Sequence, residues 1–137
     1  MLAEHRNVVP VCLPSSCGST CQQGDQIINI NWGVVQNTNQ PSALIEKRYL
    51  QMYSLQTCRQ VYGSSIADSR TICTSTESSV CDVIDGGQLA LCQRSGSYVV
   101  DALSAFATCG WNQRTSSTPL IFNRICDVTN WIETNTY

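Results

Sequence analysis

The chain has 137 residues, which suits one compact domain, and 42% of its residues are apolar, enough for a buried core. Charged residues make up only 13% and the net charge is −2, so the sequence excludes the basic surface that nucleic-acid binding requires. The sequence contains no run of eighteen apolar residues, so we expect no membrane-spanning helix.

The chain opens with M-L-A-E-H-R-N, which carries His5 and Arg6 before any apolar run and therefore lacks the pattern of a signal peptide. The first predicted strand is I-I-N-I-N, where Ile28 and Ile30 alternate with asparagines in the two-residue period of a half-buried strand. Other short stretches rich in β-branched and aromatic residues are also predicted strands: 48–53, 88–92, 98–103 and 120–125. Polar turn clusters between them favour an antiparallel barrel or sandwich.

Two segments are predicted helices. The first, T-C-R-Q-V-Y at 57–62, ends at Gly63, a residue that commonly stops a helix. The second covers 127–135 and has Asp127 as its predicted cap, followed by one apolar stripe formed by Val128, Trp131 and Ile132. We interpret the tryptophans as packing residues: Trp32, Trp111 and Trp131. Together these elements predict an all-β fold, a barrel closed by a C-terminal helix.

Nine cysteines indicate an oxidising compartment and a disulfide framework, and hence an extracellular protein. A zinc site is the competing interpretation, but His5 is the only histidine and C-G-S-T-C at 17–21 has no second pair to match it. We therefore expect no metal and no cofactor. The odd cysteine count, together with a missing export signal, leads us to expect that the natural N-terminus lies upstream.

Seven short motifs follow one another in a recognisable order: P-V-C-L-P at 10–14, N-W-G at 31–33, the helix with Cys58 and then T-I-C at 71–73, C-D-V-I-D-G-G-Q-L at 81–89, L-S-A-F at 103–106, S-T-P-L-I-F-N-R-I at 117–125, and N-W-I at 130–132. This series resembles the C-terminal half of trypsin-like (chymotrypsin-fold) serine proteases. The resemblance implies an antiparallel six-stranded Greek-key β-barrel with a short intermediate helix and a C-terminal helix. It also implies a single domain over 1–137 without the family's N-terminal barrel.

The stretch C-D-V-I-D-G-G-Q-L resembles the family's C-x-G-D-S-G-G-P-L, whose serine is the nucleophile of the catalytic triad. The resemblance puts Asp85 at the serine position, Ile84 at the position that pairs with the new N-terminus on activation, and Val83 at the oxyanion-hole glycine. An ionised carboxylate is a weak nucleophile toward an amide, and losing one oxyanion-hole donor alone costs about a hundred- to thousandfold in rate. Without the family, a D-G-G sequence would be interpreted simply as a turn.

The remaining catalytic machinery is also missing from the motifs. The family's histidine and aspartate belong to its N-terminal barrel, and His5 lies on the connection between the two barrels, where we expect it to be non-catalytic. The resemblance assigns four positions to the former specificity pocket: Ser79, Ser104, Phe106 and Leu120. Phe106 and Leu120 stand where the family usually has glycines, and their large side chains should fill the pocket.

The resemblance further implies which cysteines pair, something that spacing alone leaves open. The implied disulfides are Cys58–Cys73, Cys81–Cys109, Cys17–Cys126 and Cys21–Cys92. Cys12 is then left unpaired, and in two-chain members of the family that position bridges to the N-terminal region.

These observations predict a secreted, catalytically inactive serine protease homologue that acts as a protein-binding or regulatory module. The expected partners are proteins: an N-terminal barrel or light chain attached through Cys12, proteases, or their inhibitors. The alternative is a truncated piece of an active trypsin- or chymotrypsin-like endopeptidase, and a third interpretation is a purely structural secreted protein.

Overall fold

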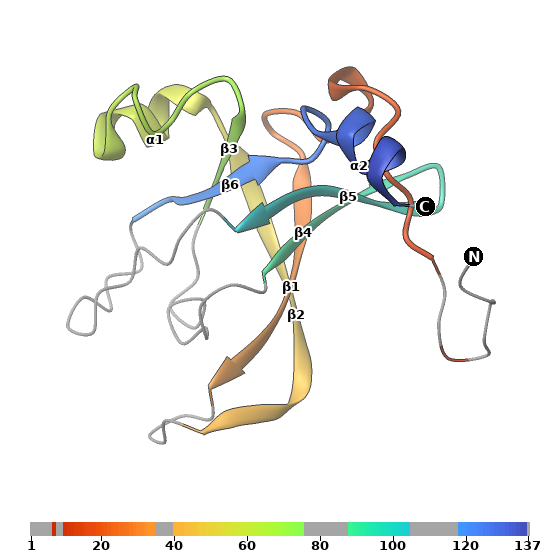
Figure 1. The fold of residues 1–137 in the computed structure, drawn as a ribbon. Coiled ribbons are helices and arrows are strands. Elements are labelled where there is room, and N and C mark those ends of the chain that lie inside the picture. Colours follow the sequence, from red (N-terminus) through yellow and green to blue (C-terminus); the bar gives the residue numbers. More distant parts are fainter. Residues whose placement is uncertain (1–6, 8–9, 35–39, 76–87, 105–117, 137) are drawn as a thin grey trace.

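The computed structural model of the chain describes residues 7, 10–34, 40–75, 88–104 and 118–136. Six strands form one closed antiparallel barrel in the order β1-β2-β3-β6-β5-β4 (Figure 1). The predicted six-stranded antiparallel barrel is therefore confirmed. The strands are β1 (Gln26–Val34), β2 (Pro41–Tyr53), β3 (Thr71–Thr74), β4 (Leu89–Arg94), β5 (Ser97–Ser104) and β6 (Leu120–Arg124).

The barrel interior holds the main hydrophobic core, built from side chains of all six strands. Its largest fully buried apolar side chains are those of Phe122, Ile27 and Leu50. Two smaller clusters lie outside the barrel wall, one under each helix. The interior cluster consists of Cys21, Ile27, Leu50, Met52, Ile72, Ala90, Cys92, Ala102, Leu120 and Phe122.

The alternation in β1 predicts a half-buried strand, but both faces of the strand are covered around Ile28 and its asparagines lie inside the barrel. Asn29 and Asn31 are fully buried, on the interior side of the wall with Ile27. Ile28 and Ile30 belong to an outer cluster, which a C-terminal helix residue, Ile132, helps to cover. Because apolar groups cover the outside of β1, Ile28 is buried and Ile30 is partly buried there, and the same two-residue period results.

The intermediate helix α1 (Leu55–Tyr62) begins two residues earlier than predicted. Ser54 caps it, since its hydroxyl accepts a hydrogen bond from the backbone N–H of Thr57. The helix ends at Gly63 as predicted: Gly63 has a φ of 81° and its N–H bonds to the carbonyl of Arg59.

The C-terminal helix α2 (Thr129–Asn135) departs from the prediction in two ways. Its N-cap residue is Val128, which makes no side-chain cap, so the prediction of Asp127 as the cap is wrong. Of the predicted stripe only Ile132 packs against the barrel, whereas Trp131 is 66% exposed and Val128 is also exposed. The short helix contacts the wall through Ile132 and turns Trp131 outward, so the prediction that Trp131 packs is wrong.

The hairpin of β1 and β2 extends beyond the rest of the barrel as a two-stranded arm (Figure 1). Strand β2 begins at Pro41, well before the predicted start at 48. Trp32 lies opposite Ile45 on this arm and is 55% exposed, so the prediction that Trp32 packs is also wrong. Neither of the two helices in the described part of the chain is long and apolar enough to cross a membrane.

Replacing Phe122 with alanine should strongly destabilise the barrel. Its side chain is 1% exposed in the interior core, and truncating a buried phenylalanine typically costs about 3–5 kcal/mol in unfolding free energy. Urea unfolding with the disulfides intact measures the change. Val61→Ala, at a half-exposed position on α1, is the control and should change the unfolding free energy little. Equal small effects of both substitutions would contradict this account of the core.

Candidate functional site

Most of the residues that the family resemblance assigns to the site lie outside the described residues. These are Ser79, Val83, Ile84, Asp85 and Phe106. The predictions made for Cys81, Cys109, Trp111 and His5 also lie outside the described residues. Two assigned positions are described, Ser104 at the end of β5 and Leu120 at the start of β6. The site is therefore described from the strand ends that flank it.

Three strand termini meet at one end of the barrel, hereafter the site end. Strand β4 begins there, next to the last residue of β5: the N–H of Ser104 donates to the carbonyl of Gln88, at 3.0 Å. Strand β6 begins at the same end, since Ser104 pairs with Phe122. The fold therefore brings the chain that follows the C-D-V-I-D-G-G motif next to the chain that leads into L-S-A-F.

Leu120 belongs to the barrel core. It is 6% exposed and lies in the interior cluster, while Ser104 is half-buried. The backbone just before Leu120 is held from outside, because the hydroxyl of Tyr62 on α1 donates to the carbonyl of Pro119 at 2.6 Å. The large side chain at position 120 is thus accommodated within the interior cluster of the barrel.

A buried polar group at the site end was missed from the sequence. The side-chain amide of Asn29 donates to the side-chain oxygen of Gln88 at 3.2 Å and to the carbonyl of Leu89 at 3.3 Å. Asn31 is also buried, and neither of its amide atoms has a hydrogen bond among the described residues. The available signal was the repeated asparagine in I-I-N-I-N, whose alternation with isoleucine leaves open which face of the strand is inward. The barrel interior is therefore polar at this end and apolar beyond it.

Three disulfides cross-link the described residues: Cys17–Cys126, Cys21–Cys92 and Cys58–Cys73. They are the pairs that the family resemblance implies for these six cysteines. Cys58–Cys73 ties α1 to β3, and the other two tie the segment before β1 to β4 and to the start of α2. Cys12 carries an exposed thiol outside these pairs, and its carbonyl accepts the N–H of Val100.

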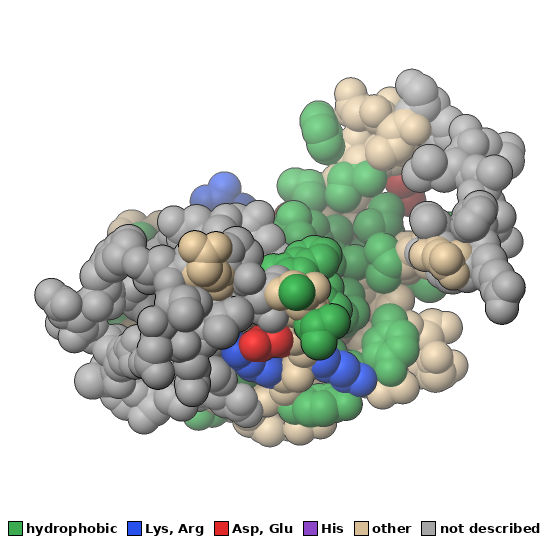
Figure 2. Space-filling view, turned by 90° about the horizontal axis from the view of Figure 1, so that it is seen from below, with side chains coloured by type: hydrophobic (Ala, Val, Ile, Leu, Met, Phe, Trp, Pro, Cys, Tyr) green, Lys and Arg blue, Asp and Glu red, His purple; other side chains and the backbone are tan. Residues whose placement is uncertain are grey.

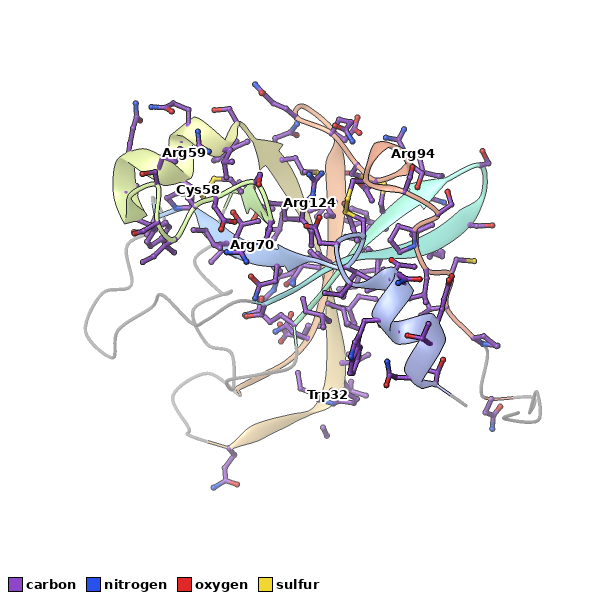
Figure 3. The ribbon with its side chains drawn as sticks, turned by 45° about the horizontal axis from the view of Figure 1, so that its top comes forward. Trp32, Cys58, Arg59, Arg70, Arg94 and Arg124 are labelled. Atoms are coloured by element: carbon purple, nitrogen blue, oxygen red, sulfur yellow. A yellow bond between two sulfur atoms is a disulfide. The ribbon has the colours of Figure 1, made fainter. Side chains whose placement is uncertain are left out.

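Asp101 lies within the wall of the barrel, away from the site end. Its side chain is fully buried, and one carboxylate oxygen accepts the N–H of Cys21 at 3.3 Å. Burial raises the pKa of Asp101 above its ordinary value, against the opposing effects of the Cys21 N–H and of Arg124 and Arg94. Arg94 and Arg124 lie at the far end of the barrel from Trp32 (Figure 3).

Among the described residues, two groups have the composition of metal sites. Asp101 lies with Cys21 and Cys92, and Asp127 lies with Cys17 and Cys126, in each case with ligand atoms within 4.8 Å of one another. In both groups the two sulfurs are joined in a disulfide, and metals bind thiolates. The cysteines in these groups therefore serve as cross-links.

The trypsin-family sequence profile, described as "Trypsin", matches residues 2–132. The chain belongs to the trypsin family. It is 26% identical to transmembrane protease serine 9 of Rattus norvegicus over 133 residues, which cover 95% of this chain and 12% of that protein. The solved structure "Structure of GrC" superposes with a TM-score of 0.74 at 21% identity, over 97% of this chain and 55% of that chain. This trypsin-family chain thus spans about an eighth of the curated relative and just over half of the solved structure.

The site end flanks the positions that the family resemblance assigns to a serine protease site. In this family the disulfide-rich barrel supports a serine protease site, and a domain with several disulfides is typical of extracellular proteins. The strand ends around Gln88, Ser104 and Leu120 are the described residues that flank the positions assigned to that site by the resemblance.

Replacing Asp101 with asparagine tests the electrostatics of the buried carboxyl. Because the pKa of Asp101 is raised on folding, its contribution to the unfolding free energy is complete below its ordinary value of 3.8 and is lost as pH rises through the raised pKa. The stability of the wild type relative to Asp101→Asn should therefore fall as pH rises through that window. Urea unfolding from pH 3.5 to 8 measures this difference.

Asp68→Asn provides the control with the opposite sign. Hydrogen bonds from Arg70 lower the pKa of the partly exposed Asp68, so its contribution is present above 3.8 and is lost as pH falls. If the wild type instead gains stability over Asp101→Asn as pH rises, then Arg124 and Arg94 hold Asp101 ionised and the assignment is wrong.

Proposed function

We propose that this trypsin-family chain is a secreted, catalytically inactive serine protease homologue that acts by binding other proteins. The observation that carries the proposal is Asp85 at the position of the family's nucleophilic serine, in C-D-V-I-D-G-G-Q-L. An ionised carboxylate has no proton to transfer to a base and attacks an amide carbonyl poorly.

Two neighbouring substitutions support the same conclusion. Val83 replaces the glycine whose backbone N–H forms the oxyanion hole, and it adds a branched side chain where the N–H groups should meet the developing oxyanion; each such donor contributes about two to three orders of magnitude in rate. Ile84 replaces the aspartate that pairs with the new N-terminus, so it cannot form the ion pair that orders the active loop. The three losses affect separate requirements of one mechanism, whereas the disulfide framework is retained.

The former specificity pocket is the third support. Leu120 stands where the family usually has a glycine, and its side chain is buried in the barrel core. Phe106, the second large residue assigned to the pocket wall, would reduce the space further, while Ser79 and Ser104 complete the set. We infer that a substrate side chain does not enter this pocket.

An apolar strip on the outside of the barrel supports a protein partner. Trp32 pairs with Ile45 across the β1–β2 arm, and Ile30 continues through Leu89 to Leu103 on neighbouring strands. Trp32, Ile45 and Leu103 are each 43–55% exposed. Apolar side chains also gather along the centre of the face shown in Figure 2. The exposed residues lie on either side of the partly buried Ile30 and Leu89, and an apolar surface patch commonly marks a protein interface.

We propose that this strip packs against a second barrel of the family, and that Cys12 bridges to the same polypeptide or to a light chain. The exposed Cys12 thiol lies on the segment that runs beside β5 through its bridge to Val99. By family analogy alone, further partners are active proteases or their inhibitors.

The alternative is that the chain is part of an active endopeptidase. The match of the trypsin profile to residues 2–132 favours it, because most of the family framework is retained. It would require a serine at position 85 in the natural transcript and an upstream barrel with the histidine and the aspartate. Sequencing the transcript through codon 85 and upstream distinguishes the two.

Peptide hydrolysis by the full-length natural protein tests the leading proposal. We expect no cleavage of peptide substrates above the uncatalysed rate, and Asp85→Ser should not restore it, because Val83 and Ile84 still block the oxyanion hole and the activation pair. Asp85→Ala is the matched control and should be equally inactive. Cleavage by the wild type that disappears in Asp85→Ala would overturn the proposal.

The state of Cys12 tests the proposed partner. In the natural protein we expect Cys12 in a disulfide to another segment or chain, so that mapping of the non-reduced protein links a Cys12 peptide to a second peptide. Cys12→Ser should abolish that link and leave Cys58–Cys73 intact. A free Cys12 thiol in the natural secreted protein would contradict the proposed bridge.

A further inference from the structure

The segment before β1 is fastened to the barrel more densely than any other described connection. We call residues 17–25 the cover segment. Two disulfides leave it, Cys17–Cys126 and Cys21–Cys92. Two carboxylates also hold it: Asp25 accepts the N–H of Gln22 and a hydrogen bond from Arg94, and Asp101 of β5 accepts the N–H of Cys21.

Of the two carboxylates that bond to the cover segment, that of Asp101 is fully buried. Its side chain is 0% exposed, and the two cysteines beside it, Cys21 and Cys92, are 3% and 0% exposed. A carboxylate oxygen and the two sulfur atoms lie within 4.8 Å of one another. The hydrogen bond to Cys21 therefore fixes the backbone of the residue whose sulfur must meet Cys92.

Loop-closure entropy in the unfolded chain does not favour the Cys21–Cys92 pair that the structure contains. Cys21 and Cys92 are separated by 71 positions, whereas Cys17 lies only four positions before Cys21. Because the entropic cost of closing a loop rises with its length, the unfolded chain favours the local Cys17–Cys21 pair over the long-range pair. Cys12 is a second nearby competitor, since it ends with an exposed thiol. Selection of Cys92 therefore comes from folded structure and not from the statistics of the unfolded chain.

We propose that Asp101 is the positioning residue that selects Cys92 as the disulfide partner of Cys21. By accepting the N–H of Cys21, its carboxyl group draws the cover segment onto β5 and presents the Cys21 sulfur to Cys92. Arg94 of β4 and Arg124 of β6 bring the same segment to the wall, since Arg94 donates to the carbonyl of Thr20 and Arg124 to its hydroxyl.

The oxidation itself requires a disulfide oxidant of the oxidised-glutathione class. One cysteine first forms a mixed disulfide with the oxidant and releases one reduced thiol. The thiolate of the other cysteine then attacks the protein sulfur of that mixed disulfide, forming the Cys21–Cys92 bond and expelling the second thiol. Two electrons pass from the two cysteines to the oxidant, whose two halves leave as thiols with the two cysteine protons. Asp101 enters no bond and acts only through the position of Cys21.

The hydrogen bond requires an acceptor oxygen and not a charge. Burial raises the pKa of Asp101, and a protonated carboxyl still accepts through its carbonyl oxygen. Asparagine keeps such an oxygen at the same distance from the backbone, whereas leucine has similar size and no acceptor. The two substitutions therefore separate hydrogen-bond positioning from both charge and volume.

Oxidative refolding of the complete reduced chain in a glutathione buffer tests the proposal, with pairs mapped by mass spectrometry after alkylation. We expect Asp101→Leu to lower the ratio of Cys21–Cys92 to all other Cys21 pairs by at least tenfold, with Cys17–Cys21 and Cys12–Cys21 increasing. Asp101→Asn should stay within twofold of the wild type. Asp68→Leu, which removes a carboxylate outside the cover segment, is the matched control and should also stay within twofold.

The Cys58–Cys73 pair shows whether an effect is local, because it closes a separate 15-residue loop around α1. Loss of Cys21–Cys92 with Cys58–Cys73 retained supports the proposal. If Asp101→Leu loses both pairs, Asp101→Ser is measured instead, since its hydroxyl is too short to reach Cys21 and keeps the site polar. Loss of both pairs in Asp101→Ser as well, native pairing in Asp101→Leu, or mispairing in Asp101→Asn equal to that in Asp101→Leu would overturn the proposal.

Discussion

The pairing of β1 with β4 is the constraint on which the barrel depends. It consists of three residue pairs, from Ile28–Leu91 to Ile30–Leu89, and it joins strands about sixty residues apart in the chain. The side chain of Asn29 reinforces it by bonding to the carbonyl of Leu89, and Cys21–Cys92 locks β4 immediately beyond the last pair. Because this seam closes the sheet on itself, the interior core and the site end both follow from it.

Much of the fold could be predicted because strands carry local signals. The stretches 27–31, 88–92, 98–103 and 120–125 all correspond to observed strands, and Gly63 stops its helix where expected. The direction in which a strand faces could not be predicted in the same way. An I-I-N-I-N strand has the same period whichever face is inward, and only the tertiary partners of Asn29 and the packing of Ile132 decide between the two.

The site could be predicted from the order of the family motifs, and much less from the pattern of polar and apolar residues. The family resemblance assigned Ser104 and Leu120, and the structure brings both to the end of the barrel where β4 begins. It gave no indication of the buried amides of Asn29 and Asn31 or of Asp101, because polar residues in isolated strands are expected to face water. Buried polar groups gain their partners from distant parts of the chain, and a single sequence does not record those partners.

The bond between Cys17 and Cys126 joins positions 109 apart, so most of the chain lies inside one covalent ring. A protease that cut any single surface loop within this ring would open it without releasing a fragment, and the two pieces would still diffuse as one molecule. The domain is therefore expected to tolerate nicking, whereas the pieces of an unlinked barrel would be held together by noncovalent contacts alone.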